Sequence, residues 1–189
     1  FCNQKYNGKL EFIIVDDEST DNTSQIILNY AERDKRIKYI NSNIDKSNLK
    51  HKKKALNAGI NASNNEYLLF TDVDCRVHDH WVQGMMDNYN SNDYVIGYSE
   101  VPISKTIVSK FQNIDFRMLM ISTCTSTMLE YPLACSGQNQ AYRKSLYIKI
   151  GGFSKIKNQI QGDDSLFLNL CRKWGKASIV FADDSRCHV

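Results

Sequence analysis

Short apolar runs alternate with amphipathic segments along this chain. Residues 12–15 and 67–70 are continuously apolar, which predicts strands buried on both faces. Further strands are expected at residues 38–40, 94–98 and 178–181. Apolar positions three and four residues apart predict helices near residues 24–31, 55–61, 81–89, 105–121, 144–150 and 165–174. This alternation predicts an α/β fold with a mostly parallel sheet flanked by helices.

One polar stretch interrupts the pattern without dividing the chain. Residues 41–54 resemble a linker and end in a basic cluster at 50–54, but the apolar pattern resumes at Ala55. We therefore expect a loop inside one domain that spans all 189 residues. Within it, residues 1–98 are predicted to form one half and residues 99–189 the other.

Composition excludes several classes of protein. Hydrophobic residues make up 42% and charged residues 24%, which is ordinary globular usage and argues against disorder. The net charge of +3 is too small to make nucleic acid the leading partner. No apolar run is long enough to span a membrane. The six cysteines have no C-x2-C spacing, so we expect reduced thiols and a cytoplasmic protein. Because the chain starts at Phe1 without a leader pattern, it is expected to be processed or cut from a longer one.

Pairs of acidic residues follow the predicted strands. Asp16 and Asp17 end the first strand, and Asp72 and Asp74 follow the strand at 67–70. A further pair at positions 163–164 opens the predicted helix at 165. In open α/β sheets, ligands bind outside the carboxyl ends of the strands. Carboxylates gathered there repel each other unless a cation or a donor group lies among them. The pattern favours Mg²⁺ or Mn²⁺, which combine protein carboxylates with substrate phosphates.

The D-x-D spacing makes a more specific prediction. On an extended chain, Asp72 and Asp74 would point to the same side, because side chains alternate with period two. One carboxylate could then bind the metal while the other holds a ribose or a water. A simpler alternative is that one of them caps the following helix. The same alternative applies to Asp17 and Asp164, each of which precedes a predicted helix.

With these residues in place, the chain resembles family-2 glycosyltransferases, which are inverting enzymes of the GT-A fold. The segment FIIVDDESTDNT at 12–23 resembles the family's nucleotide-binding segment. KALNAGI at 54–60 and EYLLFTDVDC at 66–75 resemble the approach to the metal-binding D-x-D. SGQNQAYRKSLYIKIGGF at 136–153 resembles the acceptor-side loop and helix, and QGDDSLFLNLCRKWGK at 161–176 resembles the segment with the catalytic acid. The order of these motifs along the chain matches the family.

The resemblance implies transfer of a sugar from a nucleotide-diphosphate sugar, a UDP-sugar above all, to an acceptor hydroxyl. Asp164 would act as the base, with Asp163 beside it. Asp74 would bind Mg²⁺ or Mn²⁺, together with His188, since a residue in that region does so in some relatives. The donor nucleotide would be held by Asp16, Asp17, Asp72 and a basic residue among 52–54, with Lys54 as our choice. The first half would bind the donor and the second half the acceptor.

The same resemblance suggests partners and a location. The acceptor would be a carbohydrate or a lipid-linked molecule, as in synthesis of cell-envelope polysaccharide. Relatives often have membrane helices after the catalytic core, so the parent protein could sit at the cytosolic face of a membrane.

This sequence departs from the family pattern in three respects. The family usually has Glu-Asp where this chain has Asp163-Asp164, a substitution that keeps the charge and shortens one side chain. The Q-x-x-R-W motif of polymerising synthases is missing, and Trp174 lies in an unrelated context. Only eleven residues precede Phe12, so the family's first strand is expected to be absent and the chain could be inactive alone.

Other functions leave different signatures. A response-regulator receiver domain also carries acids after a first strand, but the gap from Asp16 to Asp72 is long for one, and no apolar-Met-Pro stretch follows. A nucleotidyltransferase would carry an early Gly-rich basic loop, which this chain lacks. A non-catalytic nucleotide-sugar-binding module would keep the same acids, so the sequence leaves that alternative open.

Overall fold

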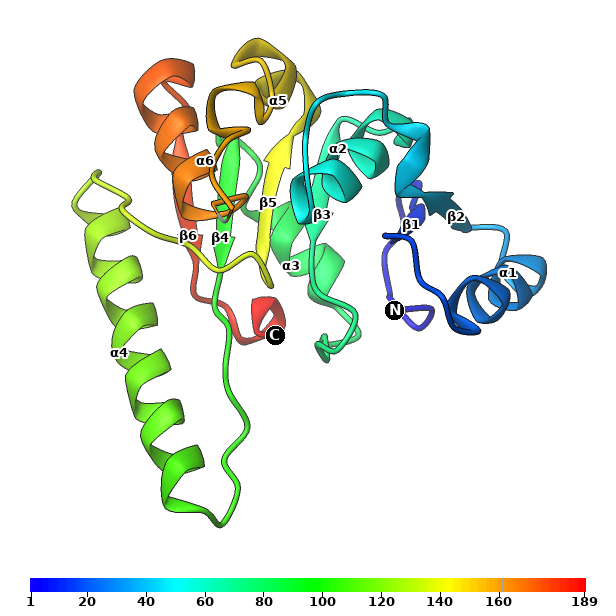
Figure 1. Ribbon diagram of the computed structural model, residues 1–189. Helices are drawn as coiled ribbons and strands as arrows, with labels where there is room; N and C mark the ends of the chain where they lie inside the picture. Colours follow the sequence, from blue (N-terminus) through cyan, green and yellow to red (C-terminus); the bar gives the residue numbers. More distant parts are fainter. Residues whose placement is uncertain (161) are drawn as a thin grey trace.

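The computed structural model describes residues 1–160 and 162–189, and Gln161, the first residue of one motif above, lies outside the described residues. Two groups of strands form the framework (Figure 1). Strands β1 (Phe12–Asp16) and β2 (Ile37–Asn41) pair in parallel. The other sheet has the order β3-β5-β4-β6 and consists of β3 (Tyr67–Phe70), β5 (Gln140–Arg143), β4 (Tyr94–Gly97) and β6 (Ile179–Ala182).

Helices cover both groups of strands. Helices α1 (Thr23–Arg33) and α2 (Lys52–Ala62) follow the first two strands, and α3 (Trp81–Asp87) follows β3. The second half of the chain adds α4 (Ile107–Met128), α5 (Lys144–Lys149) and α6 (Ser165–Leu170). Every strand and helix predicted from periodicity is present, which confirms the α/β class.

The four-stranded sheet is mostly parallel, as predicted, with one exception. No strand was predicted at β5, which pairs antiparallel with both β3 and β4, so the sheet is mixed. β3, β4 and β6 run in the same direction, and β4 and β6 pair in parallel as neighbours. Figure 1 shows the reason: α4 and the segment after it carry the chain up and back down, so β5 starts at the end where β4 stops. The sequence QAYR hid this strand, because Gln140 is buried by hydrogen bonding to Tyr94 rather than by being apolar.

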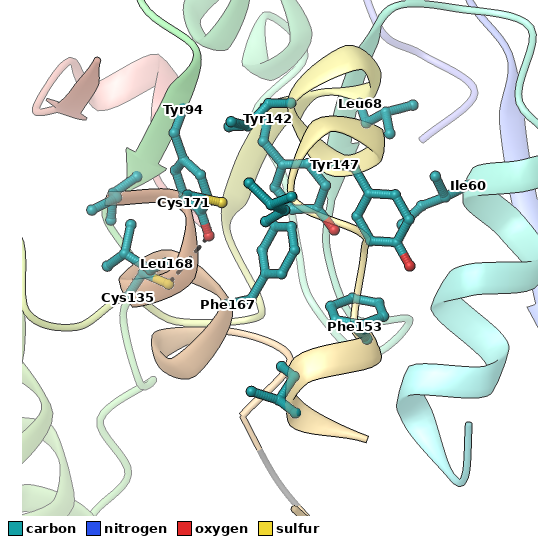
Figure 2. Packing of buried hydrophobic residues seen from close by; sticks show 14 residues of the cluster. Ile60, Leu68, Tyr94, Cys135, Tyr142, Tyr147, Phe153, Phe167, Leu168 and Cys171 are labelled. Atoms are coloured by element: carbon teal, nitrogen blue, oxygen red, sulfur yellow. Dashed lines mark hydrogen bonds between the residues drawn. The ribbon is translucent and has the colours of Figure 1, made fainter. Parts of the chain in front are cut away.

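The four-stranded sheet separates two apolar clusters. Alternate residues of β4 serve the two faces, with Tyr94 and Ile96 on one and Val95 on the other. Tyr142 lies at the centre of the larger cluster, with its ring 4.5 Å from that of Phe70 and 4.8 Å from that of Phe167 (Figure 2). The dense aromatic packing makes the sheet a rigid support for the loops that leave its strands.

Helix α2 connects the two groups of strands. A Cβ at Gly59 would come within 2.9 Å of Val15 Cγ2, so this glycine allows the helix to pack closely on β1. Its neighbour Ile60 is 2% exposed and belongs to the larger cluster of the four-stranded sheet. The position of α2 matters for function, because its first turn carries three consecutive lysines.

Candidate functional site

The site is built around the start of α2. The predicted loop over 41–54 is shorter than expected, because α2 begins at Lys52 and its first turn holds Lys52, Lys53 and Lys54. Cations are unfavourable there, since the N-terminus of a helix carries the positive end of the dipole. The residue before them, His51, has a positive φ of 53° and makes no side-chain cap. Such a start is tolerated where nearby anions compensate, and strained backbone is common at functional sites.

Lys52 joins two of the predicted acidic segments. Its Nζ lies 2.8 Å from Asp72 Oδ1, in the loop after β3, and 3.7 Å from Asp163 Oδ2, just before α6. Burial alone would lower the pKa of Lys52, but the hydrogen bond to Asp72 and the charges of Asp72, Asp163 and Asp164 outweigh it and raise that pKa. We call Lys52, Asp72, Asp163 and Asp164 the lysine–aspartate cluster.

A glycine completes this cluster from a fourth segment. A Cβ at Gly137 would lie 3.5 Å from Lys52 Nζ, 3.6 Å from Asp163 Oδ2 and 3.7 Å from Asp164 Cβ. The turn at 136–139, which leads into β5, therefore lies directly against the cluster. Four segments that are separate in the sequence therefore meet at one place: the D-x-D loop, the start of α2, the turn at 136–139 and the segment before α6.

The two acids before α6 have different surroundings. Asp164 is the N-cap residue of α6, and its Oδ1 accepts a hydrogen bond from the Ser165 N–H. The helix-cap alternative is thus correct for one of its oxygens, and it leaves Oδ2 available. Asp163 has a side chain only 13% exposed and points to Lys52. Charge compensation by the lysine explains why two adjacent carboxylates are tolerated in this half-buried place.

The D-x-D segment does not have the predicted extended geometry. β3 ends at Phe70, and a turn follows in which the Cys75 N–H bonds to the Asp72 carbonyl at 3.2 Å. The alternation rule for extended chain does not apply within such a turn, so the argument that both carboxylates share one side was wrong. Asp72 faces Lys52, whereas Asp74 is exposed. Within the described part of the chain, the Asp74 carboxylate has no hydrogen-bond or ion-pair partner.

The acids at the end of β1 divide into a structural and an accessible one. Asp16 is 4% exposed and accepts hydrogen bonds from the Ser19 N–H and the Tyr39 hydroxyl, both at 3.0 Å. Hydrogen bonding to Ser19 lowers the pKa of Asp16, and Tyr39 adds to this effect. Asp17 is exposed and accepts a 2.7 Å hydrogen bond from Ser42 Oγ. Asp16 therefore shapes the loop, and Asp17 is the one that a ligand could reach.

Lys54 belongs to this second region rather than to the lysine–aspartate cluster. Its Nζ lies 2.8 Å from Asn43 Oδ1 and 3.4 Å from Glu18 Oε1. Glu18 has a positive φ of 63°, the second strained residue beside the acids. The neighbouring Lys53 points elsewhere: it is 2% exposed and donates to the carbonyls of Gln159 and Ile160 at 2.6 and 3.4 Å. The three lysines thus serve three different segments.

His188 has contacts with other residues than these groups. Its ring stacks on Tyr98 at 4.6 Å, and Nδ1 is 3.9 Å from Glu100 Oε1. The described residues contain no group of three or more His, Cys, Asp or Glu side chains placed to hold a metal ion. All six cysteines are free thiols, as predicted. No helix in the described ranges is long and apolar enough to cross a membrane.

Sequence reasoning missed Lys52 as the central cation and Gly137 as its neighbour. It had considered the whole lysine run but preferred Lys54. The available signal for Lys52 was its place at the start of a helix that faces the D-x-D loop. For Gly137 it was the Ser-Gly turn at 136–137 before the unrecognised strand.

Comparison with known families indicates which kind of protein has this arrangement. The model of the family "Glycosyl transferase family 2" matches residues 1–151. The chain belongs to this family. Its members have the GT-A fold, which agrees with the α/β architecture, and the chain is a glycosyltransferase domain.

Curated relatives carry consistent names. The chain is 27% identical over 150 residues to the probable glycosyltransferase YdaM of Bacillus subtilis, an alignment that covers 77% of this chain and 36% of that protein. It is 27% identical over 151 residues to a poly-beta-1,6-N-acetyl-D-glucosamine synthase of Staphylococcus aureus, covering 78% of the chain and 35% of the relative. The chain thus spans about a third of the length of these relatives.

Proposed function

We propose that this domain transfers a sugar from a nucleotide-diphosphate sugar, with UDP as the nucleotide, to an acceptor hydroxyl with inversion at the anomeric carbon. One observation carries the proposal: Lys52 brings the D-x-D loop and the acidic segment before α6 together at a single cluster. The proximity of the two segments supports a site in which the donor diphosphate binds beside the D-x-D loop and the base comes from the segment before α6.

The reaction needs a group that removes the acceptor proton. The acceptor oxygen attacks the anomeric carbon from the face opposite the diphosphate, and its proton passes to a carboxylate. Asp164 fits this role, because one of its oxygens is fixed by Ser165 and the other is available. Asp163, whose carboxylate lies near Lys52, places a second negative charge beside Asp164 and orients the segment before α6.

The leaving diphosphate needs compensating positive charge. Lys52 at the start of α2 can supply it, and the orphan N–H groups of the helix add to the attraction for phosphate. In this proposal Lys52 exchanges part of its contact with Asp72 for a phosphate oxygen. Asp72 and Asp17 then accept hydrogen bonds from the ribose and the base, with Lys54 near the nucleotide and Asp16 shaping the loop.

The residues present also fit a divalent cation. Asp74 is exposed and its oxygens have no partner among the described side chains, and Mg²⁺ or Mn²⁺ commonly takes one or two carboxylates plus substrate phosphates. When bound, such an ion stabilises the negative charge that develops on the diphosphate. Asp74 is our first choice of ligand. His188 stays a prediction from the resemblance, since its contacts here are Tyr98 and Glu100.

The acceptor is proposed to be a carbohydrate. Relatives named poly-beta-1,6-N-acetyl-D-glucosamine synthase make a polysaccharide, and this chain matches them over most of its length. The turn at 136–139 and the start of α6 are the segments where an acceptor hydroxyl would approach Asp164. A sugar hydroxyl of a growing cell-envelope polysaccharide has the required chemistry.

Calorimetric titration of UDP with and without Mn²⁺ tests the donor site. We expect binding that strengthens with Mn²⁺ and loses this dependence in Asp74→Ala. Asp79→Ala is the matched control, because Asp79 is an exposed acid in the same loop outside the D-x-D. UDP binding that does not depend on Mn²⁺ would contradict the proposed site. An equal loss of metal dependence in Asp74→Ala and Asp79→Ala would contradict it as well.

A second variant tests the base. With a UDP-sugar and an acceptor present, Asp164→Asn should reduce the release of UDP by about 10²–10⁴-fold while UDP binding is retained. Unchanged release would remove Asp164 from the reaction.

A further inference from the structure

Helix α4 exposes most of its apolar residues to solvent and buries several polar residues against the protein. Asn113, Thr123 and Thr127 are buried, at 4%, 2% and 7% exposure, while Ile107 and Phe111 are 85% and 70% exposed. A helix on the surface of a monomer normally has the opposite arrangement. Figure 1 shows α4 beside β6 at the edge of the sheet, with its first turns beyond the ends of the strands.

Most of the exposed apolar residues of α4 follow a heptad pattern, with Val108 and Leu119 outside it. They recur at alternating steps of four and three residues, which is the a/d spacing of a coiled coil. The d positions are occupied by Ile107, Ile114, Ile121 and Met128, and the a positions by Phe111, Met118 and Thr125. Each of these residues is exposed. The seam therefore extends over three heptads, and none of the residues that the structure describes covers it.

The residues of α4 that face the protein body repeat with the same seven-residue period. Asn113, Met120 and Thr127 are seven residues apart and buried, at positions c of the heptad, and Thr123 at position f is buried as well. These positions lie opposite the a/d seam on the helix surface. A partner helix on the seam would consequently meet no obstruction from the body, and two bodies would lie on the outer sides of a paired helix.

The charges that flank the seam indicate which partner fits. Lys110 occupies a g position and Asp115 the e position five residues later. Both side chains are exposed, and neither has an ion-pair partner among the residues that the structure describes. Residues five apart do not meet on one helix, whereas g and e positions meet across a parallel coiled coil. Two identical helices in parallel register would form this Lys110–Asp115 pair twice.

We propose that α4 is a dimerisation helix, pairing in parallel with α4 of a second copy of this chain as a two-stranded coiled coil. The alternative antiparallel register would place Arg117 opposite Arg117 near the middle of the pair, which is unfavourable. A lipid surface would accept the apolar seam but makes no use of the heptad spacing or of Asp115.

Sedimentation velocity at about 5 and about 100 µM chain tests this interface, since dimerisation depends on concentration. We expect the mass to rise from 21.7 kDa toward twice that value. Ile114→Glu should abolish the rise, while Gln112→Glu, which adds the same residue at exposed position b, should leave it intact. Near-equal Tm values of these variants would show that the fold is unaffected.

Charge reversal tests the register. Lys110→Glu and Asp115→Lys should each weaken dimerisation roughly tenfold, because each turns two attractive pairs into repulsive ones. The double reversal should restore it. A chain that stays monomeric at both concentrations, or a double variant that stays weak, would overturn the proposal. So would monomeric binding to vesicles of phosphatidylcholine and phosphatidylglycerol that Asp115→Lys strengthens.

Discussion

Replacing Lys52 by Gln removes the cation that joins the D-x-D loop to the acidic segment. Its Nζ lies 2.8 Å from Asp72 and 3.7 Å from Asp163. Two unit charges 4 Å apart interact by about 1 kcal/mol at the dielectric constant of water and about 4 kcal/mol at an effective value of 20. The Lys52 side chain is 48% exposed, so we take the lower limit for each pair. The variant should lose about 1–2 kcal/mol of unfolding free energy at pH 7.

The pH dependence of this loss has a defined sign. The folded-state pKa of Lys52 is raised, so its stabilisation is fully present below the unfolded pKa and is lost as the pH rises through the folded one. The difference between the parent chain and Lys52→Gln should therefore be constant from neutral pH up to about 10 and shrink above that. Because the charges of Asp72, Asp163 and Asp164 raise this pKa, the profile tests the cluster itself.

Urea unfolding monitored by tryptophan fluorescence measures the effect. With a slope of roughly 2 kcal/mol per M, the midpoint should fall by about 0.5–1 M. Lys50→Gln is the control, because Lys50 is an exposed lysine just before the same helix. If the two variants unfold at the same urea concentration, or if the Lys52→Gln difference does not shrink in alkali, the ion pairs do not stabilise the fold. If UDP binding is unaffected by Lys52→Gln, the lysine is not part of the donor site.

Three further predictions concern buried groups. Lys53→Met leaves two loop carbonyls without their charged donor, so the unfolding free energy should fall by about 2 kcal/mol and amide exchange should rise in the loop before residue 161. Gly97→Ala should lower the Tm by several degrees, because the new Cβ would lie 2.3 Å from Asn139, which is fully buried and hydrogen-bonded; an unchanged Tm would mean that this contact relaxes. Burial raises the pKa of Cys187 to about 12, so at pH 8 a thiol reagent should label the exposed Cys2 in the folded protein and reach Cys187 only after unfolding, as peptide mass mapping would show.

Local patterns were sufficient for most elements of the fold. The strands at 12–15 and 67–70 are recognisable because short continuous apolar runs are typical of strands. Their predicted burial on both faces is wrong, because residues 12–15 are half-buried and Tyr67 is exposed. β5 escaped because its four residues are polar or mixed, and its buried Gln140 depends on a hydrogen bond from a distant tyrosine. Such pairing is a property of two segments, so neither segment reveals it alone.

The candidate site shows the same division. The sequence was enough to predict that acids follow the strands, and Asp72 does lie near the acids before α6. Asp16 and Asp17 instead have contacts of their own. The choice between Lys52 and Lys54 was not available from the sequence. Helical residues two positions apart point about 200° from each other, and only the placement of α2 decides which one faces Asp72. The turn at Asp72–Asp74 likewise depends on how the loop after β3 is held.

The sequence by itself determined the family, the order of strands and helices, and the positions of the acidic residues, because these depend on residue type and short-range period. Only the tertiary structure decided the direction of β5, the lysine of the cluster and the outward apolar face of α4. A helical period in the sequence shows that one face of a helix is apolar, but it does not show what that face contacts. In α4 the body of the protein takes the polar face, and the apolar seam is left for a partner.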